Sequence, residues 1–102
     1  MSIFGNVIIS ISKPCGEIIH KGKCRFINSY DEFFDSAKRT GAHGRDYKSK
    51  IIENPTWSDA VICCDEMIDT TGDLHHRYFE DVKIQEDTPE EGVTYIDFVM
   101  GS

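Results

Sequence analysis

Apolar and polar positions alternate along several short stretches of the chain. In residues 3–12, Val7, Ile9 and Ile11 share one face, while the other face is mostly polar, which is typical of a half-buried strand. Further strands are predicted at residues 17–20, 24–27, 74–86 and 93–100. The second and third of these five strands flank a glycine-containing turn, which indicates a hairpin. The last strand is apolar on both faces near its end, so we expect it to be central or to pair with another chain.

Two other segments follow the helical period. A capping box at Ser29 begins a helix that Gly41 ends, and Thr56 and Gly72 bound a second helix in the same way. Between them, residues 41–54 are predicted to contain no more than a short amphipathic turn or helix. The predicted apolar face of the second helix comprises Trp57, Ala60, Val61, Cys64, Met67 and Ile68.

This order of elements predicts an α+β protein. Amphipathic helices need an apolar surface, and half-polar strands supply one, so we expect a two-layer sandwich. It would consist of a mainly antiparallel sheet of about four to five strands with two to three helices on one face. Residues 1–102 are predicted to form a single domain. The apolar runs are too short for a membrane span, so we expect no membrane association and a cytoplasmic protein with reduced cysteines.

Charge is distributed unevenly along the chain. The net charge is −7 and the pI about 4.9, which argues against non-specific nucleic-acid binding. Residues 1–50 carry nine basic and five acidic side chains, whereas residues 51–102 carry two basic and thirteen acidic ones. This asymmetry favours a homo-oligomer in which the basic half of one copy meets the acidic half of another.

The polar face of the second helix contains one large apolar residue. Ile62 lies among Asp59, Glu66 and Asp69 at helical spacing. An exposed isoleucine on an acidic face is consistent either with an ordinary solvated helix or with an interface. We therefore take these four residues as a candidate interface with a second copy or with another protein.

A basic glycine-containing loop offers a candidate anion site. His43, Gly44, Arg45 and Lys48 combine exposed backbone N–H groups with cationic side chains, which suits phosphate or carboxylate groups. The loop does not match the P-loop or the dinucleotide-binding pattern. A solvated loop after a helix end is the alternative interpretation.

Catalysis is a further alternative. Asp73, His75 and His76 follow the second helix, and a carboxylate beside a histidine suits acid–base chemistry or metal binding. Adjacent histidines in a strand point to opposite faces, however, so only one can line a given site. Cys63 and Cys64 lie between acidic residues, which disfavours a reactive thiolate.

Cys15, His20 and Cys24 form the alternative metal set. They supply three ligands where structural zinc takes four, and they lack a closely spaced cysteine pair. The sequence as a whole favours a small binding or interaction protein without a cofactor. A small enzyme, or a protein that binds a metal or an anion, stays open as the alternative.

Overall fold

The computed structural model describes residues 2–28, 47–72, 74, 76–85 and 90–101, which contain six strands and one helix. The strands are β1 (Ser2–Phe4), β2 (Val7–Ile9), β3 (Lys23–Ile27), β4 (Ile52–Glu53), β5 (Tyr78–Ile84) and β6 (Val93–Gly101), and the helix is α1 (Trp57–Thr71).

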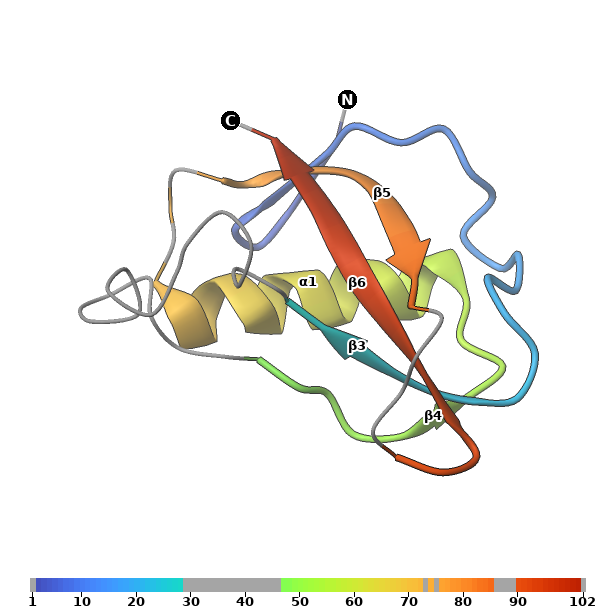
Figure 1. Cartoon of the computed structure of the whole chain (residues 1–102). Coiled ribbons are helices and arrows are strands. Elements are labelled where there is room, and N and C mark those ends of the chain that lie inside the picture. Colours follow the sequence, from blue (N-terminus) through green and yellow to red (C-terminus); the bar gives the residue numbers. More distant parts are fainter. Residues whose placement is uncertain (1, 29–46, 73, 75, 86–89, 102) are drawn as a thin grey trace.

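The six strands form one mixed sheet in the order β1-β2-β5-β6-β3-β4. The pairs β1–β2, β5–β6 and β3–β4 are antiparallel, whereas β2–β5 and β6–β3 are parallel. The sheet curves into a half-barrel, and α1 lies across its concave side (Figure 1). The central strand β6 therefore joins two halves of the sheet, which confirms the central position that its two apolar faces predict.

The core lies between α1 and the concave face of the sheet. Phe26 of β3 stacks on Phe98 of β6 with ring centroids 5.5 Å apart, and Phe79 of β5 meets Phe98 edge-on at 5.9 Å. Trp57 at the start of α1 closes this aromatic cluster against Phe79 at 6.3 Å. From α1, the other buried core residues are Ala60, Cys63, Cys64, Met67 and Ile68.

Both ends of α1 agree with the prediction. Thr56 and Asp59 form the expected capping box, and Gly72 ends the helix in the left-handed conformation with φ 73°. The N–H groups of the first turn need acceptors. The N–H of Trp57 donates to the carbonyl of Glu17 at 3.2 Å, and the N–H of Ser58 donates to the carbonyl of Cys15 at 3.0 Å. A segment distant in sequence therefore completes the cap.

The predicted α+β two-layer sandwich is wrong. The described residues form mainly sheet, this sheet is mixed rather than mainly antiparallel, and it has six strands instead of four to five. One helix, instead of two to three, lies in the described part of the chain. The helix predicted to begin at Ser29 falls outside the described residues. Parallel pairing escaped the prediction because it joins strands that are far apart in sequence.

The predicted strand 3–12 is two strands. Gly5 and Asn6 form a two-residue turn between β1 and β2, and Gly5 has φ 56°, which glycine adopts without strain. The turn is fastened to α1, since Asp65 Oδ1 accepts the N–H of Asn6 at 2.7 Å and Asp69 Oδ1 accepts its side-chain amide at 3.0 Å. Arg77 Nε donates to the carbonyl of Asn6 at 2.8 Å.

Three further local predictions need correction. Residues 17–20 do not pair with β3, because their polar backbone groups serve the start of α1 instead. Residues 47–53 are extended along β3, not helical. In β5, the pairing with β6 is irregular between Phe79 and Asp81. Strict alternation would place these two side chains on the same face of the sheet, but Phe79 is buried in the core while Asp81 is exposed.

Candidate functional site

A groove of about 370 Å³ separates α1 from the extended segment 47–52. This volume is at the lower end of the range for ligand sites, which is about 300–1,000 Å³. The helix lines the groove with residues at positions i, i+3, i+4 and i+7, which is one face of a helix. The lining residues are Tyr47, Lys48, Ser49, Lys50, Ile52, Asp59, Ile62, Cys63 and Glu66.

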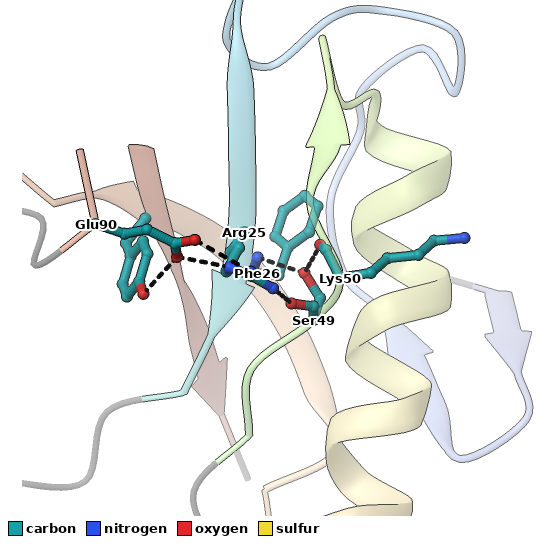
Figure 2. A network of polar contacts seen from close by, with 6 residues as sticks. Arg25, Phe26, Ser49, Lys50 and Glu90 are labelled. Carbon is teal, nitrogen blue, oxygen red and sulfur yellow. Dashed lines mark hydrogen bonds and ion pairs between the residues drawn. The ribbon is translucent and has the colours of Figure 1, made fainter. Parts of the chain in front are cut away.

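Ser49 fixes the segment that forms the outer wall of this groove. Its buried Oγ accepts the N–H of Phe26 at 2.9 Å and donates to the carbonyl of Lys50 at 2.7 Å, while its N–H donates to the carbonyl of Phe26 at 2.9 Å (Figure 2). The register between β3 and this segment shifts by one residue, since Ile27 faces Lys48 but Cys24 faces Ile52. Beside this bulge, the serine hydroxyl thus accepts the N–H of Phe26 in place of the backbone carbonyl that a regular ladder would supply.

A polar network braces the same segment from the other side of β3 (Figure 2). Arg25 Nη1 donates to the carbonyl of Ser49 at 2.6 Å, and its Nε and Nη2 donate to the two carboxylate oxygens of Glu90 at 2.8 and 3.2 Å. The hydroxyl of Tyr95 also donates to Glu90, at 3.0 Å. The hydrogen bond from Arg25 lowers the pKa of Glu90, so this carboxylate stays charged. Lys48 Nζ lies 5.5 Å from the centre of the Tyr95 ring.

The floor of the groove contains two groups that stay protonated. The hydroxyl of Tyr47 donates to Glu66 Oε1 at 2.8 Å, and burial raises the pKa of this tyrosine far above its usual value. Cys63 is 4% exposed, and burial raises the pKa of its thiol as well. Cys64, on the core side of α1, has a pKa raised to about 12 for the same reason. These environments disfavour nucleophilic catalysis, because a reactive cysteine needs a lowered pKa.

The walls of the groove carry charges of opposite sign around an apolar centre. Lys50 is exposed on the segment, and its side chain extends toward α1 in Figure 2, whereas the Nζ of Lys48 lies over the Tyr95 ring and acts on Glu90 instead. Asp59 and Glu66 lie on the helix, and the side chain of Ile62 between them is 44% exposed. Each carboxylate has one oxygen in an internal hydrogen bond, to Thr56 and Tyr47 respectively. The other oxygen of each accepts no hydrogen bond from the described residues.

Part of the predicted interface therefore lies in the groove and part does not. The groove is lined by Asp59, Ile62 and Glu66. In contrast, the Asp69 carboxylate accepts a hydrogen bond from the side chain of Asn6 at the β1–β2 turn. Lys48 brings one member of the predicted anion site to the groove. The other members, His43, Gly44 and Arg45, fall outside the described residues.

The remaining candidates do not converge on this site. Asp73 and His75 lie outside the described residues, and His76 is half-buried and does not line the groove. Of the metal set, Cys15 is exposed and Cys24 is buried, with its thiol 3.6 Å from the carbonyl of Gly22. His20 Nε2 lies 3.5 Å from Thr94 Oγ1. Within the described residues, no group of three or more His, Cys, Asp or Glu side chains is arranged to hold a metal ion.

Sequence reasoning missed the other contributors to the groove. Tyr47 and Ser49 are buried while Lys48 and Lys50 are exposed, so residues 47–50 alternate with the period of a strand. That alternation was the available signal, but only four residues carry it. Cys63 is not among the residues of the predicted apolar face, yet it is buried beneath the groove.

Comparison of the chain with protein-family models, with curated proteins and with solved structures gave no match. No helix in the described part of the chain has the length and apolar character that a membrane crossing needs. The groove is therefore the feature of the chain from which its function is inferred.

Proposed function

We propose that this chain is a non-catalytic binding protein and that the groove receives an extended segment of a partner protein. The observation that carries this proposal is the position of Ile62, whose exposed side chain lies in a groove between Lys50 on one wall and two carboxylates on the other. A solvated helix face would leave such an isoleucine on a convex surface. Its place in a hollow beside a rigid extended segment suits insertion of an apolar side chain.

The charges indicate what the occupant looks like. Lys50 is an exposed cation on the extended segment, and it lies on one side of Ile62. Asp59 and Glu66 are seven residues apart on α1, a separation of about 10 Å. A peptide that places an apolar residue on Ile62 can direct an acidic side chain to Lys50 and basic side chains to the two carboxylates of α1. Charge complementarity of this kind fixes the register of a bound segment.

The protonation states of the floor support binding rather than chemistry. Tyr47 and Cys63 stay neutral at physiological pH because burial raises the pKa of each. They offer an uncharged surface beneath the charged walls. A second copy or another protein as the partner, a cytoplasmic location and the lack of non-specific nucleic-acid binding stay predictions from the sequence.

Selection from a displayed library of random peptides tests this proposal. We expect enriched peptides to share one apolar residue flanked by charges of both signs, and to lose binding to the Ile62→Asp variant. Leu74→Asp is the matched control, since Leu74 is 61% exposed, lies outside the groove and takes the same change in charge. Peptides that bind Ile62→Asp as well as the parent protein, or a selection that yields no such pattern, would refute the proposal.

A further inference from the structure

The two edges of the sheet differ in how they are protected against pairing with another chain. Edge strands expose unpaired backbone groups, and soluble proteins protect them with charges, proline, bulges or covering segments. The edge along residues 47–53 has such protection, because it has a bulge and carries Lys48, Lys50 and Glu53. The opposite edge is β1, and within the described residues it has no charged side chain, no proline and no bulge.

The chain around β1 carries no charged side chain. No residue from 1 to 12 is charged, and none of them is proline. The three residues of β1 pair with β2 without irregularity, in the register Ser2–Ile9, Ile3–Ile8 and Phe4–Val7. The side chain of Ile3 is 70% exposed and that of Phe4 is 44% exposed. An apolar, regular and open edge of this kind is what strand addition requires.

The register also shows where the backbone of β1 points. The N–H of Ile8 donates to the carbonyl of Arg77 on the β5 side, at 2.8 Å. Residues that face each other in an antiparallel pair alternate between bonded and non-bonded pairs, so Ile3 and Ile8 form a non-bonded pair. Both the N–H and the C=O of Ile3 therefore point away from β2, toward the open edge.

We propose that two copies of this chain pair through β1, with Ile3 facing the partner's Ile3 in an antiparallel arrangement. This pairing is self-complementary, because a twofold axis beside Ile3 places each N–H opposite the partner's C=O. It continues the sheet from one copy into the other and covers Ile3 and Phe4. The absence of charge favours a second copy over a charged partner. This inference does not rest on the groove, which is lined by other elements.

Sedimentation equilibrium from about 10 µM to about 1 mM, the range of weak transient association, tests the pairing. We expect the parent protein to dimerise with rising concentration. Ile3→Pro removes the outward N–H without breaking a bond inside one chain, and it should weaken the dimer about tenfold or more. Ile3→Lys places a charge on the edge and should have the same effect. Leu74→Lys and Ile62→Asp are the controls and should leave the dimer unchanged.

Salt gives a second and independent test. Pairing through β1 uses backbone hydrogen bonds and apolar contacts, so raising the ionic strength to about 1 M should not dissociate the dimer. A dimer that dissociates in salt, or one that both Ile3 variants leave intact, would overturn the proposal. A parent protein that stays monomeric throughout would overturn it as well. Circular dichroism of the variants verifies that each retains the parent fold, and Ile3→Lys carries the test if Ile3→Pro does not fold.

Discussion

Replacing Ser49 by alanine removes the acceptor that holds the outer wall of the groove to β3. The N–H of Phe26 then lies in the core without a partner, because Ser49 Oγ is its acceptor at 2.9 Å and Phe26 is fully buried. A buried donor left without a partner costs about 1–3 kcal/mol. Ser49→Ala should therefore lower the free energy of unfolding by about 2 kcal/mol. For a chain of this length, such a loss lowers the melting temperature by about 10 °C.

Urea denaturation followed by circular dichroism measures this change. Ser58→Ala is the matched control, since Ser58 is exposed on α1 and alanine favours the helix. We expect the control to change the free energy of unfolding by no more than about 0.5 kcal/mol. If Ser49→Ala and Ser58→Ala unfold at the same urea concentration with equal slopes, the Ser49 hydroxyl does not hold the segment.

Two other substitutions test the remaining braces. Gly5→Ala should destabilise the fold by about 2–3 kcal/mol, because a Cβ there collides with the Asp65 carboxylate as well as straining a positive φ. Gly92→Ala also has a positive φ, 77°, but no atom of the described residues lies near its Cβ, so it should cost less in the same urea titration; equal losses would contradict the clash. The pKa of Glu90 is lowered in the folded state, so its contribution to stability is present at neutral pH and is lost as pH falls through that pKa. The difference in unfolding free energy between the parent and Glu90→Gln should then shrink from pH 7 to pH 3, and a constant difference would contradict the ion pair with Arg25.

Helix α1 could be predicted from the sequence because its signals are local. The capping box of Thr56 with Asp59 and the left-handed Gly72 lie within a turn of the residues that they affect. Its apolar face follows the 3.6-residue period over four turns. The helix side of the groove could therefore be predicted from the sequence, including the exposed position of Ile62.

The sheet was less predictable because its pairing depends on distant segments. β2 pairs with β5 and β3 with β6, across about seventy residues in each case, and no short-range pattern encodes such a choice. The turn at Gly5 was missed although its signal is local, since a glycine followed by asparagine between Phe4 and Val7 is typical of a hairpin. The outer wall of the groove depends on both kinds of information. The alternation of buried and exposed residues along 47–50 is a local signal, whereas the attachment of this segment to β3 through Ser49 depends on residues far away in the sequence.

The structure also changes the meaning of the charge asymmetry. Asymmetry between the halves of the chain favoured self-assembly through opposite charges, yet Arg25 of the basic half pairs with Glu90 of the acidic half inside one chain. Asp65 and Asp69 likewise serve the β1–β2 turn, where they accept hydrogen bonds from Asn6. Much of the charge on α1 thus stabilises the fold, which leaves the free oxygens of two carboxylates for the groove. Contact between copies is then better assigned to the uncharged edge at β1, whose pairing needs no opposite charge and should resist salt.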